Sequence, residues 1–238
     1  MADDRPTVIL TRPERAARRF ATSLEAVLSC RARVLIAPII EIVPQPAEHD
    51  FSPYQTLIFT SENAVLSLGD PVSLAGRTAY CVGDRTAETA TLAGYEGIPA
   101  AGGAAALEAR LLADAPPGPW LHPSGAHRSS DLAETLTAAG HRTDRVVIYR
   151  QEPRPLSAEA ARALRERLTI LPLFSPRSAM LLSRAVPSDA RPPVVVAISP
   201  AAARSWSAPA RAVRIAPNPD ADSVSATIRA ALDSDAPC

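Results

Sequence analysis

The sequence repeats itself in outline, and this repeat limits the folds that the chain can adopt. The apolar run and hydroxyl turn at 57–65 (LIFTSENAV) return at 172–180 as PLFSPRSAM. The segment 80–87 (YCVGDRTA) follows the first copy at nearly the distance at which 196–203 (VAISPAAA) follows the second. These ordered pairs indicate duplicated strand–turn–helix units.

A further pair of segments extends the repeat. LTRP at 10–13 opens a helical segment that leads to the apolar run 34–37, and LHPSG at 121–125 opens another that leads to 146–149. We therefore predict two similar lobes, with the functional site between them.

The spacing of apolar residues predicts the fold class. Short β-branched runs alternate with segments of helical period that are rich in alanine, leucine and arginine. This pattern is typical of an α/β protein with parallel sheets covered by helices on both faces. The expected strands are 7–10, 34–43, 56–60, 78–82, 119–122, 144–151, 170–174, 194–198 and 212–216. The clearest expected helices are 13–30, 84–94, 126–139, 157–168 and 222–232, with Ser157 and Asp222 as N-caps.

Two segments are predicted to cross between the lobes. The runs at 37–44 and 147–153 both pass from apolar strand character into polar sequence limited by proline. One lobe is then inserted into the other. The expected division is a first lobe of 1–38 and 154–238, an inserted second lobe of 44–148, and linker strands at 39–43 and 149–153.

The charge of the chain argues against several ligand classes. The 25 basic residues balance 25 acidic residues, so no overall field draws the chain to nucleic acid or to an anionic membrane. All the basic residues are arginine, which excludes a catalytic Schiff-base lysine. Any anionic ligand must therefore be held by local groups.

The cysteines and the N-terminal sequence predict a soluble cytoplasmic protein. Cys30, Cys81 and Cys238 are scattered and lack the paired spacing of disulfides or of a zinc site. The chain opens without an apolar signal region, and no apolar run approaches the ~20 residues that a membrane span requires.

Hydroxyl and glycine residues follow several of the expected strands. In parallel α/β sheets, ligands bind beyond the carboxyl ends of the strands, where helix N-termini present unpaired N–H groups to anions. The alternative is that each hydroxyl only caps its own helix. The candidate binding residues of this kind are Thr60, Ser61, Thr86, Ser124, Gly125, Ser175 and Ser199.

Other kinds of site have little support in the sequence. No GxxxxGK[ST] phosphate loop, GxGxxG turn or GxSxG elbow is present. The histidines form no short-spaced ligand pattern with cysteine or acidic residues, so we expect no metal site and place the histidines in loops or at the surface. They are His49, His122, His127 and His141.

Tyr149 and Arg12 each allow a functional and a structural interpretation. Tyr149 ends an apolar strand at a proposed crossing, where its phenol can donate a proton or simply pack as a hinge aromatic. Arg12 follows a strand, where it can grip a carboxylate with two hydrogen bonds or lie outward as a surface charge.

The ordered set of short motifs resembles the uroporphyrinogen-III synthase family over nearly the whole chain. Val8–Pro13 (VILTRP) is similar to the opening strand of that family, and 59–65 to its first hydroxyl turn. The segment 82–87 is similar to its Gly-x-x-Thr-Ala turn. The later motifs occur in the expected order and comprise Gly125 with the helix after it, 147–149, 174–176 and 198–204.

The resemblance implies a fold and a reaction. The fold is two α/β lobes joined by a two-stranded linker. The substrate is hydroxymethylbilane, a linear tetrapyrrole with eight carboxylates, which the family cyclises with loss of water and inversion of the terminal ring. The enzyme is then a hydro-lyase of heme biosynthesis that acts as a monomer, without a metal or an organic cofactor. Its main task is to hold one conformation of a reactive intermediate.

The resemblance also suggests roles for individual residues. Tyr149 matches the tyrosine that assists departure of the hydroxide, and Ser61, Thr86 and Ser175 match hydroxyls that contact the substrate. The chain departs from the family at 199–202, where SPAA replaces the common Gly-Pro-Thr-Thr. Ala201 is still expected to bind substrate through its backbone.

The two missing hydroxyls motivate an alternative function. In this alternative, the chain is a non-catalytic protein of the same fold that binds a tetrapyrrole or another polyanion. A bilobal enzyme acting on sugars or nucleotides is a third possibility, for which the sequence supplies no dedicated phosphate loop.

Overall fold

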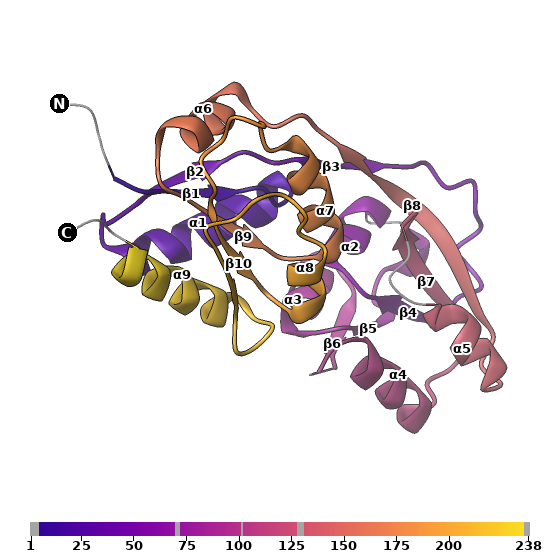
Figure 1. Ribbon diagram of the computed structural model, residues 1–238. Coiled ribbons are helices and arrows are strands. Elements are labelled where there is room, and N and C mark those ends of the chain that lie inside the picture. Colours follow the sequence, from indigo (N-terminus) through magenta and orange to yellow (C-terminus); the bar gives the residue numbers. More distant parts are fainter. Residues whose placement is uncertain (1–4, 70–71, 101, 128–130, 236–238) are drawn as a thin grey trace. The chain divides into compact units, whose positions relative to one another are not determined.

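A computed structural model describes residues 5–69, 72–100, 102–127 and 131–235 (Figure 1). The chain divides into two compact units, each with its own sheet. Unit 1 comprises Met1–Glu41 and Glu152–Cys238, and unit 2 comprises Ile42–Gln151.

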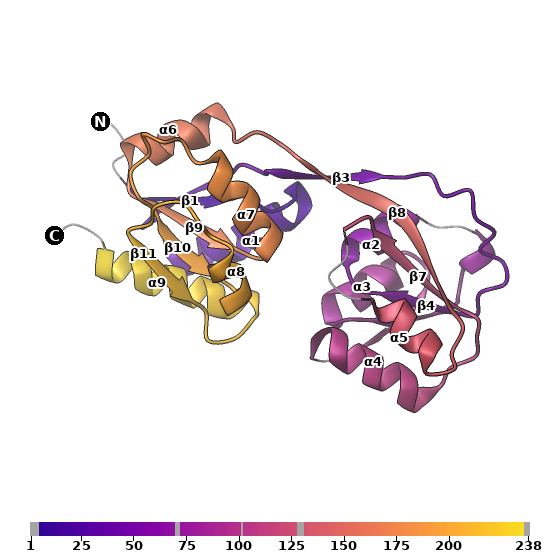
Figure 2. The ribbon, with the colours of Figure 1, turned by 45° about the vertical axis from the view of Figure 1, so that its right-hand side comes forward.

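Unit 1 contains one parallel sheet. Its strands are β1 (Thr7–Leu10), β2 (Arg33–Ile36), β9 (Thr169–Leu173), β10 (Val194–Ala197) and β11 (Ala212–Ile215). They lie side by side in the order β2-β1-β9-β10-β11. Figure 2 labels the four strands from β1 to β11. The helices of this unit are α1 (Glu14–Leu28), α6 (Ala158–Glu166), α7 (Pro176–Ala185), α8 (Pro200–Arg204) and α9 (Ala221–Asp235).

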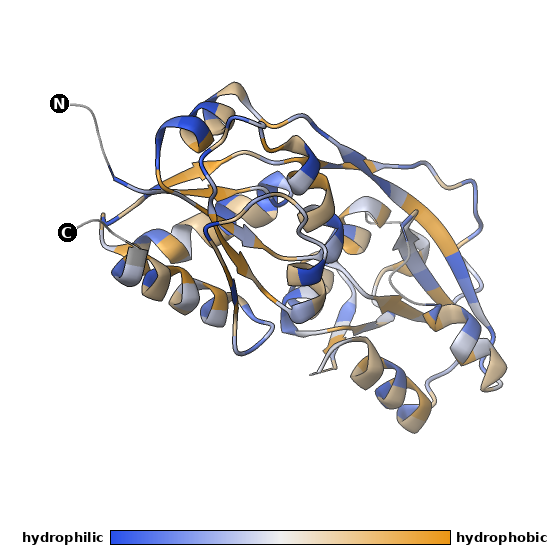
Figure 3. Ribbon diagram, in the orientation of Figure 1, coloured by the Kyte–Doolittle hydropathy of each residue, from blue (hydrophilic) through white to orange (hydrophobic). Residues whose placement is uncertain are grey.

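The core of unit 1 follows from the helical and strand periods of its sequence. In α1, Phe20, Leu24 and Leu28 recur every four residues and form a fully buried stripe. This stripe packs with residues of α9 against one face of the sheet, to which β10 contributes Val194 and Val196. The strands are correspondingly hydrophobic in Figure 3, whereas the helices carry both kinds of residue.

Unit 2 contains a second sheet. Its strands are β3 (Ile40–Pro44), β4 (Thr56–Phe59), β5 (Thr78–Cys81), β6 (Glu96–Pro99), β7 (Trp120–Gly125) and β8 (Thr143–Pro153), of which β3 and β8 run on into unit 1. The order across this sheet is β3-β8-β7-β4-β5-β6. The helices are α2 (Glu62–Leu68), a short 3-10 turn (Val72–Leu74), α3 (Asp84–Leu92), α4 (Gly103–Asp114) and α5 (Leu132–Ala138).

The two faces of the sheet in unit 2 are covered by different buried clusters. Leu57, Phe59 and Leu121 belong to a cluster that includes residues of α2 and α3. Ile58 and Trp120 point to the other face and pack with leucines of α4 and α5. The alternation along β4 is the two-residue period of a strand that is buried on both faces.

The two sheets share one topology, as the sequence repeat predicts. The repeat pairs β4 with β9, β5 with β10, β7 with β1, and β8 with β2. Under this pairing β8-β7-β4-β5-β6 in unit 2 corresponds strand by strand to β2-β1-β9-β10-β11 in unit 1. The prediction of an α/β fold with two similar parallel-sheet units is therefore confirmed.

Strands β3 and β8 form an antiparallel pair. The backbone N–H of Gln45 donates to Ile148 at 2.7 Å, and that of Arg154 donates to Ile39 at 2.8 Å. From Ile39 to Gln45 the residue number increases through β3, whereas the number of the partner decreases from Arg154 to Ile148 through β8. The two strands therefore run in opposite directions. Arg154 also forms an ion pair with Glu41 at 2.8 Å.

The predicted element boundaries need correction at several places. The expected strand 34–43 is two strands, because the chain leaves β2 at Ala37 and Pro38 before β3 begins. The expected N-cap Asp222 lies inside the first turn of α9. Asp220 caps this turn instead, since its Oδ1 accepts a hydrogen bond from the N–H of Ser223 at 2.7 Å.

The region after β7 also differs from the prediction. The expected strand 119–122 continues to Gly125, because β8 pairs with it over this whole length, with a bulge at Ser124 and Gly125. The expected helix 126–139 is shorter, and α5 begins at Leu132. Residues 128–130 of that prediction lie outside the described residues.

Candidate active site

Each sheet has a switch point, where connections leave two neighbouring strands toward opposite sides. It lies between β4 and β7 in unit 2 and between β1 and β9 in unit 1. Ligands of parallel α/β sheets bind at the carboxyl ends of the strands at such points. Most of the candidate residues predicted from the sequence lie at these ends.

Tyr149 lies in the carboxyl half of β8 and is only 6% exposed. Its ring belongs to the buried cluster that contains Leu57, Phe59 and Leu121. Its carbonyl accepts a hydrogen bond from the N–H of Ala126 at 3.0 Å, which fixes the backbone beside the end of β7. The phenol is therefore held by packing and by the sheet, and it is not a loose surface group.

Gly125 contacts the ring of Tyr149. A Cβ built on Gly125 would lie 2.7 Å from Cζ and 3.0 Å from the hydroxyl oxygen of Tyr149. Real Cβ atoms do not approach other atoms so closely, so this position accepts the tyrosine only because it is glycine. Gly125 was expected in a turn, but it is the last residue of strand β7, where it makes room for the phenol. Its role in binding stays a prediction.

Ser61 links Tyr149 to the start of α2. The Ser61 side chain forms a hydrogen bond with the Tyr149 hydroxyl, and its Oγ accepts a hydrogen bond from the N–H of Asn63 at 3.1 Å. Burial raises the pKa of Tyr149, and the bond from Ser61 lowers it by a smaller amount. The phenol is consequently protonated at neutral pH and has a donor directed at its oxygen.

A second polar group occupies the other face of the same strand ends. His122 is 4% exposed, and its Nε2 lies 3.4 Å from Oγ1 of Thr60. Ser124 follows two residues later on the same face of β7 and is also buried. Among the described residues, neither Nδ1 of His122 nor Oγ of Ser124 has a hydrogen-bond partner.

The unpartnered nitrogen indicates which tautomer His122 adopts. Burial, with a smaller effect from the positive charge of Arg145, lowers the pKa of His122 to about 4, so the imidazole is neutral at pH 7. An unpaired acceptor costs less in a protein interior than an unpaired N–H. We therefore assign the proton to Nε2, which donates to Thr60 and leaves the Thr60 hydroxyl hydrogen available to a ligand.

His122 and Arg145 were not among the predicted site residues, and the prediction that His122 lies in a loop or at the surface is wrong. His122 pairs in register with Arg145 on β8, and Arg145 donates a hydrogen bond to the carbonyl of Gly125 at 2.6 Å. The signal in the sequence was their place within apolar strands, where a polar residue must find a partner.

Thr86 lies in the first turn of α3 and is 5% exposed. The N-cap of this helix is Gly83, whose carbonyl accepts a hydrogen bond from the N–H of Thr86 at 3.1 Å. The hydroxyl of Thr86 is thus not needed to cap its own helix at the N-cap position.

The hydroxyls at the strand ends of unit 1 are helix caps. Oγ of Ser175 accepts a hydrogen bond from the N–H of Ser178 at 3.1 Å, and Oγ of Ser199 accepts one from Ala202 at 3.2 Å. In the short helix α8, Ala201 is exposed, whereas Ala202 is fully buried. The capping role considered from the sequence is therefore real. Oγ of Ser178 donates to the Ser175 carbonyl at 2.9 Å and lies 2.9 Å from Oγ of Ser175, so the Ser175 hydroxyl hydrogen is directed at Ser178, whereas the cap at Ser199 does not use the Ser199 hydroxyl hydrogen.

Arg12 is fixed at the switch point of unit 1 by an aromatic ring. Its guanidinium carbon lies 4.0 Å from the centroid of Phe174, which directly precedes Ser175. Phe174 in turn packs edge-on against Phe20 at 4.9 Å. This cation–π contact holds Arg12 beside the start of α7, so Arg12 is not a freely moving surface charge.

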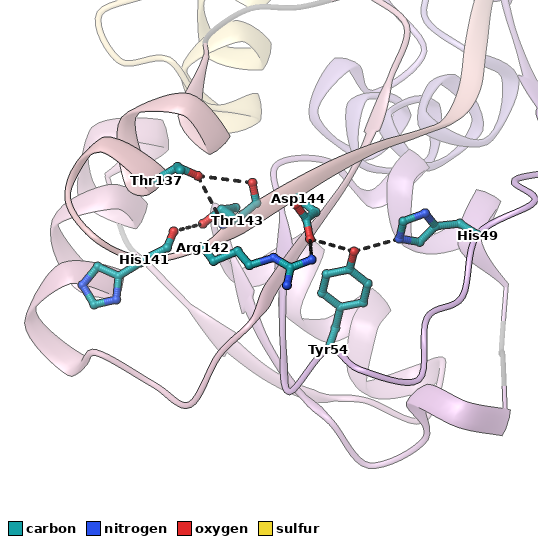
Figure 4. A network of polar contacts seen from close by, with 7 residues as sticks. All are labelled: His49, Tyr54, Thr137, His141, Arg142, Thr143 and Asp144. Atoms are coloured by element: carbon teal, nitrogen blue, oxygen red, sulfur yellow. Dashed lines mark hydrogen bonds and ion pairs between the residues drawn. The ribbon is translucent and has the colours of Figure 1, made fainter.

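A separate polar network lies at the opposite, amino edge of the sheet in unit 2 (Figure 4). The Tyr54 hydroxyl donates to Asp144 at 2.9 Å and contacts Nε2 of His49 at 2.8 Å, while Arg142 donates to Asp144 at 3.0 Å. Burial and the Asp144 carboxylate raise the pKa of Tyr54 to about 12. This network ties the segment before β4 to the start of β8.

The described residues contain neither a candidate metal cluster nor a candidate membrane span. Within them, no group of three or more histidine, cysteine, aspartate and glutamate residues could hold a metal ion. The helices of the same part of the chain are all too short or too polar to cross a membrane.

Comparisons with known proteins agree with the fold. The model of the family described as Uroporphyrinogen-III synthase HemD matches residues 24–226. The crystal structure of uroporphyrinogen-III synthetase from Helicobacter pylori 26695 has a TM-score of 0.67 at 19% sequence identity, covering 95% of this chain and 99% of that chain. A mutant uroporphyrinogen III synthase from the extremely thermophilic bacterium Thermus thermophilus has a TM-score of 0.53 at 16% identity, covering 97% of this chain and 100% of that one. A search of curated proteins gave no match.

Proposed function

Because the chain belongs to the uroporphyrinogen-III synthase family, its function is the synthesis of uroporphyrinogen III, and we propose that Tyr149 is the proton donor of this reaction. The observation that carries the proposal is the environment of the Tyr149 hydroxyl. The hydroxyl is protonated because burial raises its pKa. It also accepts a hydrogen bond from Ser61 and packs against Gly125, which leaves room for it.

The proposed reaction starts with departure of the terminal hydroxyl of hydroxymethylbilane. Tyr149 donates its proton to this hydroxyl, the carbon–oxygen bond breaks, and water leaves. The hydrogen bond from Ser61 stabilises the phenolate that forms, and the N–H of Asn63 supports Ser61 in turn. The cation that remains is attacked by the substituted carbon of the last pyrrole, and the spiro intermediate reopens and closes with that ring inverted. The proton lost at the final closure returns to the phenolate of Tyr149, which regenerates the proton donor. The net reaction is the loss of one water molecule, so the enzyme is a hydro-lyase.

The carboxylates of the substrate require donors, and both units offer them at their strand ends. In unit 2 we assign this role to Thr60, Thr86, Ser124 and the backbone at Gly125. Thr60 suits the role because Nε2 of His122 donates to the Thr60 hydroxyl oxygen. The Thr60 hydroxyl hydrogen then points away from His122 and can be donated to a ligand. The Ser124 hydroxyl has no partner among the described residues and can therefore bind a ligand without losing an existing bond.

In unit 1 the proposed substrate-binding residues are Arg12, Ser175, Ser199 and Ala201. Arg12 supplies a guanidinium that Phe174 holds in place, so little side-chain entropy is lost when it binds a carboxylate. Ser199 keeps a hydroxyl hydrogen for the ligand while it caps α8, and Ser175, which caps α7, can turn its hydroxyl from Ser178 to a ligand. Ala201 contributes its backbone.

We also propose a domain division, a cellular location and an oligomeric state for the protein. The two lobes of the family correspond to 1–38 with 154–238 and to 44–148, with linker strands at 39–43 and 149–153. The protein acts in the cytoplasm as a monomer, and it needs neither a metal nor an organic cofactor for the steps above.

The test is to supply hydroxymethylbilane to the purified protein, oxidise the products and separate the type I and type III porphyrins. We expect predominantly type III, because spontaneous closure of the bilane gives the uninverted isomer. The alternative function is a protein that binds tetrapyrroles without turnover, which the alanines at 201 and 202 favour. Type I product at the uncatalysed rate, with tight binding of the bilane by folded protein, would establish that alternative.

A further inference from the structure

Unit 1 contains a pocket of about 410 Å³ that the proposed function does not use. Its lining comes from the segments directly before β9, β10 and β11, so it lies at the amino edge of the sheet. The proposed substrate-binding residues of this unit follow the carboxyl ends of the same sheet, and a strand of five residues such as β9 spans about 16 Å. The pocket is lined by Arg167, Leu168, Arg191, Pro192, Ala210 and Arg211.

The lining of this pocket is cationic. It contains three arginines, and no acidic residue belongs to it. Among the described residues, the side chains of Arg167 and Arg191 form no hydrogen bond or ion pair. Asp189, the acidic residue nearest to Arg191 in the sequence, is already held by Nε of Arg165, which donates to both carboxylate oxygens at 2.9 and 2.8 Å.

This arrangement favours an anion with several charged groups. Guanidinium groups bind carboxylates and phosphates through two parallel hydrogen bonds, and like charges gathered in one pocket repel one another until an anion neutralises them. The volume exceeds the ~30 Å³ of one water molecule many times and is in the range of small-molecule sites. Leu168, Pro192 and Ala210 provide apolar surface for the carbon skeleton of an organic ligand.

We propose that this arginine pocket is a second binding site, for a small polyanion that carries two or three phosphate or carboxylate groups. Such an anion bridges guanidinium groups that come from the starts of neighbouring strands. This second site does not depend on the reaction assigned to Tyr149, since its residues lie at the amino edge of the sheet in unit 1, whereas Tyr149 belongs to unit 2.

The first experiment is calorimetric titration of the full chain with pyrophosphate and, separately, with propane-1,2,3-tricarboxylate at low ionic strength. Saturable binding of pyrophosphate alone identifies a phosphate site, and binding of the tricarboxylate alone identifies a carboxylate site. Binding of both identifies a general polyanion site. Failure of both probes to bind overturns the proposal.

The second experiment locates the binding. The double variant Arg167→Gln/Arg191→Gln is expected to lose roughly tenfold or more in affinity, because charge-assisted hydrogen bonds are removed. Arg162→Gln is the matched control, since Arg162 lies on the exposed side of α6 outside the pocket. An equal loss in both variants would mean unspecific attraction to surface arginines and would overturn the proposal.

Two readouts keep this test independent of folding and of catalysis. Thermal unfolding shows whether the double variant is folded, and only the wild-type chain and Arg162→Gln should gain stability when the bound probe is added. Turnover of hydroxymethylbilane should be unchanged in the double variant. Loss of probe binding with normal turnover therefore supports the second site even if the role of Tyr149 is later revised.

Discussion

The ring of Tyr149 fills the space in which a side chain at position 125 would lie. A Cβ on Gly125 would be 2.7 Å from Cζ and 2.8 Å from Cε2 of that ring. The end of strand β7 can lie against the ring of Tyr149 only because its last residue, Gly125, has no side chain. The contact couples the end of β7 to the position of the phenol, and through Ser61 to the start of α2.

Gly125→Ala should displace the phenol. The added methyl group overfills a packed region, which we expect to lower the free energy of unfolding by about 1–3 kcal/mol. Turnover should fall roughly tenfold or more, because small displacements of reacting groups are costly. Urea unfolding and product formation from hydroxymethylbilane measure both effects. Gly118→Ala is the control, since the nearest atom to its Cβ would be 3.6 Å away. Normal turnover of Gly125→Ala would show that the position of Tyr149 is not critical.

Tyr149→Phe should separate catalysis from packing. The phenylalanine ring keeps the contacts of the buried cluster, so the free energy of unfolding should change by no more than about 1 kcal/mol for the lost bond to Ser61. Loss of the proton donor should reduce kcat roughly 100-fold or more. Steady-state kinetics with analysis of the type III product measures this loss. An unchanged kcat would remove Tyr149 from the mechanism.

Tyr54→Phe should have the opposite effect. It removes the hydroxyl that donates to Asp144 and contacts His49, and we expect the free energy of unfolding to fall by about 1–2 kcal/mol. Turnover should be normal, because the network of Tyr54 lies at the amino edge of the sheet. Thermal unfolding and kinetics of the two tyrosine variants, measured side by side, check this contrast. A loss of turnover in Tyr54→Phe would indicate that the network also supports the candidate active site.

The sequence predicts much of the fold because a strand that is buried on both faces is a continuous apolar run, which can be recognised locally in the sequence. The strands β9 and β10 are apolar runs of branched residues, and the repeat correctly matches their units with β4 and β5. Strand β6 was missed because its sequence, EGIP, has a single large apolar residue. It is an edge strand that pairs only with β5, and none of its residues is fully buried, so it does not need an apolar run.

The site was predicted less completely, for a physical reason. Hydroxyls after strands are visible in the sequence, whereas the roles of His122 and Gly125 depend on contacts between strands that are distant along the chain. The pairing of His122 with Arg145 and the contact of Gly125 with Tyr149 both arise from the register of β7 with β8. Nothing local to either strand fixes that register.

His122 should make stability depend on pH. Its pKa in the folded protein is about 4, against 6.5 for an exposed imidazole. Between these values the unfolded chain binds the extra proton, so the free energy of unfolding should fall as the pH is lowered from about 6.5 to 4, by about 3 kcal/mol in full. Urea unfolding of the wild-type chain and of His122→Phe at several pH values isolates this contribution. The dependence should be flatter in His122→Phe, whereas the exposed control His127→Gln should behave like wild type. Identical slopes in all three proteins would contradict the assignment.

The alanines of α8 should respond differently to the hydroxyls that are common in the family. Ala201 is exposed, so Ala201→Thr adds a hydroxyl without disturbing packing, and we expect KM for hydroxymethylbilane to fall roughly two- to tenfold through one new hydrogen bond. Ala202 is fully buried, so Ala202→Thr overfills the space beneath α8 and should cost about 1–3 kcal/mol of stability. Kinetics and thermal unfolding of the two variants distinguish the effects. If Ala201→Thr leaves KM unchanged while the protein is folded, the exposed face of α8 does not contact the substrate, and the role of Ala201 in binding would have to be withdrawn.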